Sequence, residues 1–328
     1  MYSSLPMPKI LYLDQNAWVV LARGAWDKAE FPKEHAALST VIEAVRTSDL
    51  TVPLSLSNIY ETAKINNPAR RINMARTQTV ISRGKVFRGR RRIFAETLAA
   101  YLAERFSLTY PAPPERWFLS DLWFEGAADY SPELYGYEIS QRIRDFMLEK
   151  PAETLFDYLA FSDEAVRMEA VRRHTASSSE LVAKIEARRA IVASETFAIR
   201  KRAYGARIII DEMDFILETG RRLGLDWHTV RDIGSSLVRS LAVDVPVLNV
   251  ERELVTRLED QARAISENDL RDLAAFTAVL PLADVMVAEK PFVNLARQAR
   301  LSQRYETTLL TSIFHLSAEV LWLDRTPA

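Results

Sequence analysis

The sequence contains no cysteine, which excludes disulfides and thiolate-bound zinc or iron–sulfur clusters. Its four histidines, His35, His174, His228 and His315, lie far apart and form no metal-ligand spacing such as HExxH. No segment approaches the roughly 20 consecutive apolar residues that a membrane span needs. Any bound metal would therefore be held most easily by oxygen ligands, which favours Mg²⁺ or Mn²⁺.

Other bulk properties are ordinary. The chain has 328 residues, enough for one large domain or two smaller ones. It is 48% hydrophobic and 27% charged, and its formal net charge of -1 points to no partner. The opening "MYSSLPMPK" lacks the apolar core of a signal peptide. We expect a soluble, cytoplasmic protein that does not bind membranes.

The first third of the chain has α/β character. Ile10 to Leu13 is a short apolar run that predicts a buried strand, and Leu50 to Ser55 predicts a second one. Apolar residues at helical spacing predict a helix from Glu34 to Arg46 between them. A further helix should begin near Asn58, and other helices should reach Phe106.

A stretch rich in proline and aromatic residues then marks a boundary. Its rings are Trp117, Phe118, Trp123, Phe124, Tyr130, Tyr135 and Tyr137. We expect them to attach the following segment to the core, with an interface as the alternative. From Glu138 to Leu241 the pattern is almost wholly helical, and Ser177 to Gly220 predicts one long helix with a serine cap.

The last third returns to α/β character. Helices are predicted over Glu251 to Ile265 and Asp269 to Val279, followed by a turn at Pro281 and a strand over Val285 to Ala288. The simplest architecture is one α/β core, formed by residues 8–106 and 244–328 and interrupted by an all-helical insertion, residues 107–243. This insertion should restrict access to the core's functional site, or dock a protein partner or a second copy.

Acidic residues stand where predicted strands end or the next helices begin. Asp14 directly follows the first strand, where it either caps the next helix or holds a ligand at the sheet edge. Glu61 lies in the helix after the second strand, and its spacing from Asn58 also fits a capping box. Either motif alone is explained by helix capping.

Two more acidic motifs occur near the end of the chain. Asp269 and Asp272 in "NDLRD" share one helix face, although Asn268 and the helix dipole offer a capping explanation for the first turn. Asp284 precedes the last predicted strand, where a solvated charge is the simpler interpretation, and Glu289 follows it.

The combination carries more weight than each motif. The carboxyl ends of parallel strands share one edge of a sheet, so Asp14, Glu61, Asp272 and Glu289 should converge there. Packed without counter-charge, these carboxylates would repel one another and their pKa values would rise. One or two Mg²⁺ or Mn²⁺ ions would remove the repulsion and supply the charge needed for phosphoryl chemistry.

This order of "LYLDQN", Glu61, "NDLRD" and "VAEK" resembles the PIN domain, over residues 9–106 and 245–316. The resemblance implies a three-layer α/β fold with a central parallel sheet and metal-dependent nuclease activity, on RNA rather than DNA. It makes Asp14, Glu61, Asp272 and Glu289 the catalytic, metal-binding acids. Asp269 and Asp284 become auxiliary metal ligands. Many such nucleases act as toxins or as effectors of defence against phage.

The chain departs from the family pattern in two respects. Many PIN domains end the set with Thr-x-Asp or Ser-x-Asp, where this chain has "VAEK", and few carry so long an insertion. Two other functions stay open. One is a PIN-like module that binds RNA or protein without cutting. The other is an aspartate-nucleophile phosphatase, although Asn16 stands where such enzymes have a second aspartate.

A basic stretch follows Glu61. Between Thr62 and Ala95 there are ten Lys or Arg residues and no Asp or Glu. Such a cluster suits a phosphate backbone, whereas a solvated surface paired with acidic helices is the common alternative. The residues predicted to bind nucleic acid are Arg70, Arg71, Lys85, Arg88, Arg90, Arg91 and Arg92.

Overall fold

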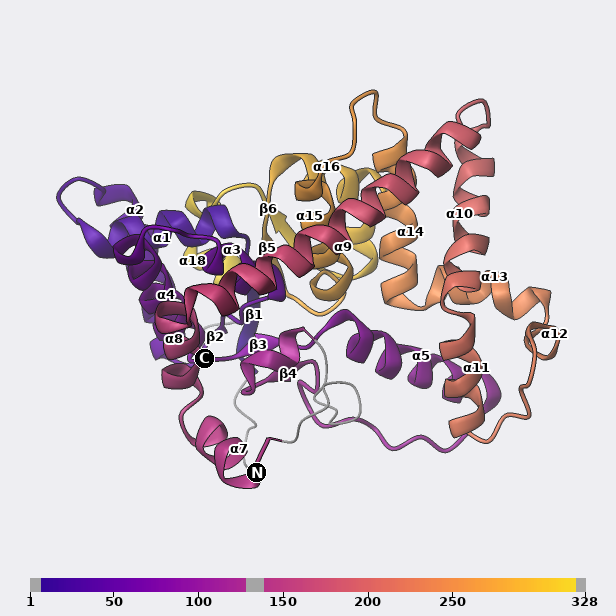
Figure 1. Ribbon diagram of the computed structural model, residues 1–328, viewed down its shortest axis with the longest axis horizontal. Coiled ribbons are helices and arrows are strands. Elements are labelled where there is room, and N and C mark those ends of the chain that lie inside the picture. Colours follow the sequence, from indigo (N-terminus) through magenta and orange to yellow (C-terminus); the bar gives the residue numbers. More distant parts are fainter. Residues whose placement is uncertain (1–6, 128–138, 323–328) are drawn as a thin grey trace.

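Four parallel strands form the central sheet of the computed structural model, which describes residues 7–127 and 139–322 (Figure 1). Their spatial order is β2 (Leu50–Thr51), β1 (Lys9–Leu13), β5 (Val285–Val287) and β6 (Thr308–Leu310). All neighbouring pairs run parallel. The two ends of the chain thus contribute two strands each to one sheet, and the prediction of a mixed α/β protein is confirmed.

Successive residues of β1 face opposite sides of the sheet, as strand geometry requires. Leu11 and Leu13 belong to one buried cluster, and Ile10 and Tyr12 belong to the other. Both faces are therefore covered, which explains why β1 appears in the sequence as an uninterrupted apolar run.

Helices from distant parts of the chain supply both covers. On the Leu11 face lie α1 (Gln15–Trp26), α2 (Pro32–Arg46), α4 (Pro68–Ser82) and α8 (Pro151–Phe161). On the Tyr12 face lie α5 (Arg90–Phe106), α14 (Pro246–Glu259), α15 (Glu267–Val279) and α16 (Lys290–Gln298). The sheet is thus the middle of three layers.

Two predicted boundaries shift at prolines. The strand expected to reach Ser55 already ends at Thr51, before Pro53, and Ser55 instead caps α3 (Leu56–Ala63). Proline lacks the N–H group that a ladder needs, so it ends the strand. The helix expected from Glu251 begins at Pro246, because proline favours the first helical position.

The long helix predicted over Ser177 to Gly220 is wrong. The chain forms α9 (Glu164–Ile191), α10 (Phe197–Asp211) and α11 (Met213–Arg222) instead. The backbone turns between α9 and α10, and the Thr196 side chain caps the second helix. Figure 1 shows α9 crossing the molecule from the neighbourhood of α8 to α10. The predicted serine cap lies inside α9.

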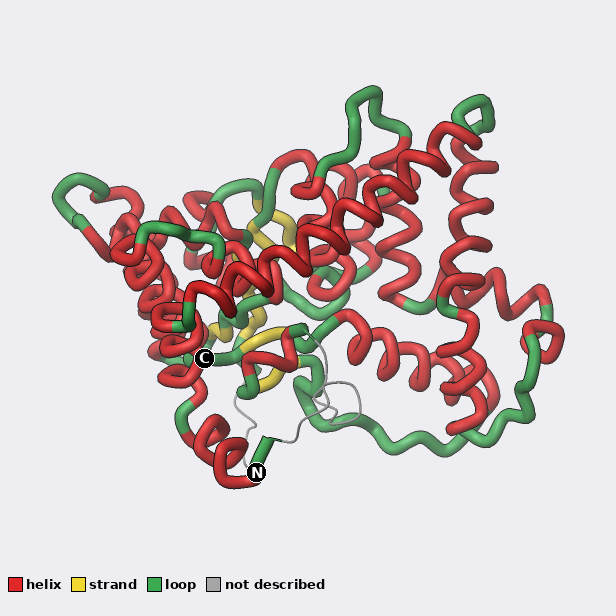
Figure 2. The backbone as a smooth tube through the Cα atoms, viewed as in Figure 1, coloured by secondary structure: helices red, strands yellow, loops and turns green. Residues whose placement is uncertain are grey.

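The prediction that residues 107–243 form an all-helical insertion is wrong, because a short strand lies among them (Figure 2). β4 (Leu119–Ser120) pairs antiparallel with β3 (Val86–Phe87) in a separate two-stranded sheet. The described residues of the segment add no strand to the central sheet. The other helices that begin in this segment and have not yet been named are η1 (Trp123–Gly126), α7 (Gln141–Glu149), α12 (Val230–Ile233) and α13 (Ser235–Asp244). Near the end of the chain lie α17 (Leu301–Arg304), η2 (Ile313–His315) and α18 (Ala318–Trp322).

This segment shares its cores with the rest of the chain. Leu155 and Leu159 of α8 belong to the Leu11 cluster, whereas Ile208 and Ile209 of α10 belong to the Tyr12 cluster. Packing therefore continues across both predicted boundaries. Within the two described stretches, no helix is both long and apolar enough to cross a bilayer.

The aromatic boundary residues pack inward where the structure describes them. The Trp123 ring stacks on Tyr158 of α8 with a centroid separation of 3.8 Å, and Phe118 stacks on Phe87 at 6.3 Å. Trp117 packs on the Tyr12 cluster. Tyr130, Tyr135 and Tyr137 lie outside the described residues. The packing supports the attachment role over an interface.

Trp123→Ala should lower the free energy of unfolding by about 2–3 kcal/mol, below the 3–5 typical of a fully buried tryptophan because this ring is partly exposed. Chemical denaturation measures the loss, and mass measurement should show an unchanged oligomeric state. Trp26→Ala is the control, because that side chain is 67% exposed and should change stability little. Loss of an oligomer with unchanged stability would instead indicate an interface.

Candidate active site

Asp14 lies at the carboxyl end of β1, and both of its predicted roles are compatible with its position. Its backbone N–H donates to the carbonyl of Val287 at 3.0 Å, which continues the pairing with β5. Its carboxylate accepts from the N–H of Ala17 at 2.9 Å and so caps α1. The cap engages Oδ1, and the backbone N–H of Asn16 also donates to the carboxylate.

Glu289 approaches Asp14 from the neighbouring strand. It follows β5, occupies the cap position of α16, and accepts a hydrogen bond from Asn16 Nδ2 at 2.8 Å. A cavity of about 400 Å³ opens here, where β1, β5 and β6 end. Both carboxylates line it, together with Lys290 and Ser312. This edge is where ligands bind in open parallel sheets.

Asp272 on α15 brings a third carboxylate to the same place. Burial, followed by the charges of Glu289 and Asp14, raises the pKa of Asp272 to about 8. Burial also raises the pKa of Asp14 to about 6, and Glu289 adds to the rise against the hydrogen bond from Ala17. No described residue offers the Asp272 carboxylate a hydrogen bond or an ion pair. Three segments of the chain thus place mutually repelling acids together.

Glu61 lies beside this group, but it is neutralised. Its carboxylate forms an ion pair with Arg271 Nε at 2.8 Å. Arg271 precedes Asp272 in α15, so the pair joins α3 to the acidic helix. The capping explanation for Glu61 is wrong, because Ser55 and Asn58 form the capping box of α3.

The two predicted auxiliary ligands are engaged elsewhere. Asp269 accepts two hydrogen bonds from Arg263, at 2.6 and 2.7 Å, and forms a capping box with Ser266. Against the effect of burial, these partners hold the pKa of Asp269 below its usual value. Asp284 lies at the amino end of β5, where it accepts from the N–H of Ile10 at 2.6 Å. Asp284 thus lies at the end of the sheet opposite Asp14. We leave Asp269 and Asp284 out of the candidate site.

As the side chains stand, no group of three or more His, Asp or Glu within residues 7–127 and 139–322 has an arrangement that could hold a metal ion. Glu289 is close enough to raise the pKa of Asp14 and of Asp272, but the oxygens of the three carboxylates do not converge on one point.

A closed ring of side-chain hydrogen bonds supports the turn that carries Asp14, and the motifs described above do not predict it. Gln15 donates to Thr62 at 3.2 Å, Thr62 donates to Gln78 at 2.9 Å, and Gln78 donates back to Gln15 at 3.4 Å. Thr62 and Gln78 are both fully buried. The ring ties the first residue of α1 to α3 and α4, and so steadies the turn that carries Asp14. Polar residues on the buried faces of α3 and α4 are the signal that could have revealed it.

Most of the basic stretch predicted to bind nucleic acid is paired. Three ion pairs are Lys85–Asp121, Arg88–Glu125 and Arg92–Glu96, with N–O distances of 2.8, 2.6 and 2.6 Å. Arg71 is buried and donates to the carbonyl of Ile65 at 2.9 Å. Of the seven predicted residues, Arg70 alone is exposed with no partner among the described residues for its side chain.

Arg90 and Arg91 hold helices together. Arg90 contacts Glu212 at 2.8 Å and Glu251 at 2.6 Å, and Arg91 contacts Glu212 at 2.6 Å. Burial lowers the pKa of Arg90, but the two carboxylates outweigh this effect and raise the pKa above its usual value. These arginines lie at the start of α5, which Figure 1 places toward α11 and away from α1 and α4. Their predicted contact with nucleic acid is replaced by a structural role.

Arg90→Ala should destabilise the fold by about 3 kcal/mol, because it leaves Glu212 and Glu251 without their shared partner in a partly buried place. Thermal and urea unfolding measure this. Nucleic-acid affinity, measured well below the unfolding transition, should keep the wild-type salt dependence. A lower salt slope with normal stability would restore Arg90 to the nucleic-acid interface.

Comparisons of the chain with protein-family models, with curated proteins and with solved structures found no match to any of them.

Proposed function

We propose that the protein is a PIN-like, metal-dependent nuclease that hydrolyses phosphodiester bonds, in RNA rather than DNA. The observation that carries the proposal is the meeting of Asp14, Asp272 and Glu289 at the carboxyl edge of the sheet. Asp14 follows β1, Asp272 lies on α15 and Glu289 follows β5. Burial and the neighbouring carboxylates raise the pKa values of Asp14 and Asp272, and for Asp272 they outweigh the lowering effect of Arg271. A structural role does not account for such an arrangement, since repelling buried charges lower stability.

The donor set fits Mg²⁺ or Mn²⁺. It consists of carboxylate oxygens, which hard divalent cations prefer, and it offers no nitrogen or sulfur ligand. Asp14, Asp272 and Glu289 would hold the ion, and Glu61 would join them only after releasing Arg271. When bound, such an ion supplies positive charge that lowers the pKa of water and offsets the charge of a phosphate.

The chain's own residues have defined tasks in this proposal. Asn16 orients Glu289 through its hydrogen bond. The ring of hydrogen bonds that includes Gln15 keeps the turn after β1 in place. Arg271, on the same helix as Asp272, pairs with Glu61, and its guanidinium would contact a phosphate once that ion pair opens. Asp272, with a pKa of about 8, would hold a proton at neutral pH in the metal-free site and would act as a ligand in its ionised form.

The test is the loss of a labelled single-stranded RNA in the presence of Mg²⁺, of Mn²⁺, or of EDTA alone. Cleavage that depends on either metal supports the proposal. Binding without cleavage under all three conditions favours the non-catalytic PIN-like module. Release of phosphate from a small monoester, with RNA left intact, favours the aspartate-nucleophile phosphatase. Cleavage of DNA in preference to RNA would correct the substrate but keep the chemistry.

A further inference from the structure

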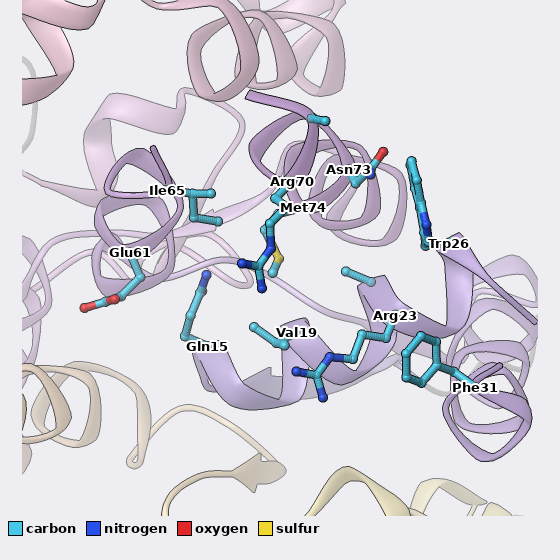
Figure 3. A pocket seen from close by; sticks show the side chains of 12 residues that line it. Gln15, Val19, Arg23, Trp26, Phe31, Glu61, Ile65, Arg70, Asn73 and Met74 are labelled. Carbon is cyan, nitrogen blue, oxygen red and sulfur yellow. The ribbon is translucent and has the colours of Figure 1, made fainter. Parts of the chain in front are cut away.

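A groove of about 550 Å³ lies between α1 and α4 and begins beside the acidic site (Figure 3). Gln15 and Glu61 stand at one end of it, and Trp26 and Phe31 stand at the other. Its lining residues are Gln15, Val19, Ala22, Arg23, Trp26, Phe31, Glu61, Ile65, Ala69, Arg70, Asn73 and Met74. The groove therefore leads away from the carboxylates over the surface of the Leu11 layer.

Two arginines give the groove positive charge. Arg23 and Arg70 are exposed, and Figure 3 shows both side chains reaching into the space between the helices. Neither makes an ion pair with a residue in the described part of the chain. The one carboxylate in the lining, Glu61, points away from the groove and is neutralised by Arg271. An anionic ligand would thus meet two guanidinium groups that no described residue pairs.

The far end offers flat aromatic surface. The Trp26 side chain is 67% exposed, the highest value among the large apolar side chains of α1, and Phe31 is half-buried beside it. Neither ring contacts another described aromatic ring. Covering an indole this exposed with a planar group removes apolar surface from water, which lowers the free energy of the complex.

Polar groups complete the lining. The Gln15 amide faces the groove at the end nearest the acids, and its hydrogen bonds to Thr62 and Gln78 hold it in place. The Asn73 amide lies in the lining nearer the rings. Cations, rings and amides in one elongated groove are the three kinds of group that bind single-stranded nucleic acid, through its phosphates, its base faces and its base edges.

We infer that this groove binds the unpaired nucleotides that flank the bond to be cut, with Trp26 and Phe31 stacking on bases and Arg23 and Arg70 contacting phosphates. The inference rests on the proposed nuclease function and specifies its substrate as a single strand. A duplex would not fit, because its paired bases keep their faces stacked on one another and cannot cover the rings.

The test measures binding, so it does not depend on cleavage. The parent is Asp14→Asn in EDTA, and the probe is a labelled oligouridylate of about 12 nucleotides, within the usual site sizes. In this background Trp26→Ala should weaken binding about five-fold or more. Arg23→Gln with Arg70→Gln should lower the slope of log K against log salt by about 1.4, or about 0.7 for each lost phosphate contact. The parent's tryptophan fluorescence should be quenched by the probe, and the quenching should shrink in Trp26→Ala.

Arg105→Gln is the matched control, since it removes one exposed charge from α5, far from the groove, and should leave affinity unchanged. The inference is overturned if the parent does not bind the probe, if a duplex of equal length binds as well, or if the groove variants bind like the parent. If the groove binds a protein segment instead, the parent will not bind the probe. Failure of the nuclease proposal is separate: it would appear as groove-dependent binding with no cleavage by the wild type in Mg²⁺ or Mn²⁺.

Discussion

Asp14→Asn should abolish metal-dependent cleavage, with a loss on the order of 10³-fold or more in rate. A metal ion contributes several kcal/mol of charge stabilisation in the transition state, and about 1.4 kcal/mol corresponds to a tenfold change in rate. Asparagine keeps the side-chain oxygen that accepts from Ala17, and it is as good a helix cap as aspartate. The fold and the start of α1 should therefore be intact, so the lost rate reports the lost charge.

Asp284→Asn makes the same chemical change at the other edge of the sheet. Its remaining oxygen can still accept from the N–H of Ile10, so the variant should fold normally and cleave at the wild-type rate. Single-turnover cleavage of RNA, measured for both variants across a range of Mn²⁺ concentrations, compares the two edges directly. Unchanged cleavage by Asp14→Asn would remove Asp14 from the mechanism, and equal losses in both variants would point to general damage to the sheet.

The acids at the sheet edge could be predicted because each depends on local information. A short apolar run that is followed at once by Asp14 or Glu289 defines both the strand and its carboxyl end. The same logic also excludes Asp284, because a residue that precedes a strand lies at the opposite edge of a parallel sheet.

Pairing between distant residues could not be predicted in this way. Arg271 neutralises Glu61 from 210 positions away in the chain. Arg90 pairs with Glu212, between α10 and α11, and with Glu251 on α14, which lie 122 and 161 positions away. The basic stretch looks unpaired in the sequence because its partners lie outside it. The break between α9 and α10 was missed for a different reason: helical spacing continues through the turn, and only the cap at Thr196 marks it.

Asp272→Asn should stabilise the metal-free protein, and the gain should depend on pH. The pKa of Asp272 is raised in the folded state, so the folded protein keeps a proton that the unfolded chain releases from about pH 4 upward. Stability of the wild type must then fall as pH rises from about 4 to 8 and level off above that. The full shift corresponds to about 6 kcal/mol at about 1.4 kcal/mol per pKa unit, which partial exposure reduces to roughly 2 kcal/mol.

Urea unfolding in EDTA at pH 5 and pH 8.5 checks this expectation. The variant should exceed the wild type clearly at pH 8.5 and only slightly at pH 5, because asparagine does not ionise. Saturating Mn²⁺ should reverse the order at pH 8.5, since an ion bound to the wild type at 100 times its dissociation constant adds about 2.7 kcal/mol that a weakened site cannot match. Asp211→Asn, on the exposed end of α10, controls for the loss of one negative charge. A variant less stable than the wild type at pH 8.5 without metal would mean that Asp272 is engaged structurally, and the crowding of carboxylates that supports the metal site would have to be abandoned.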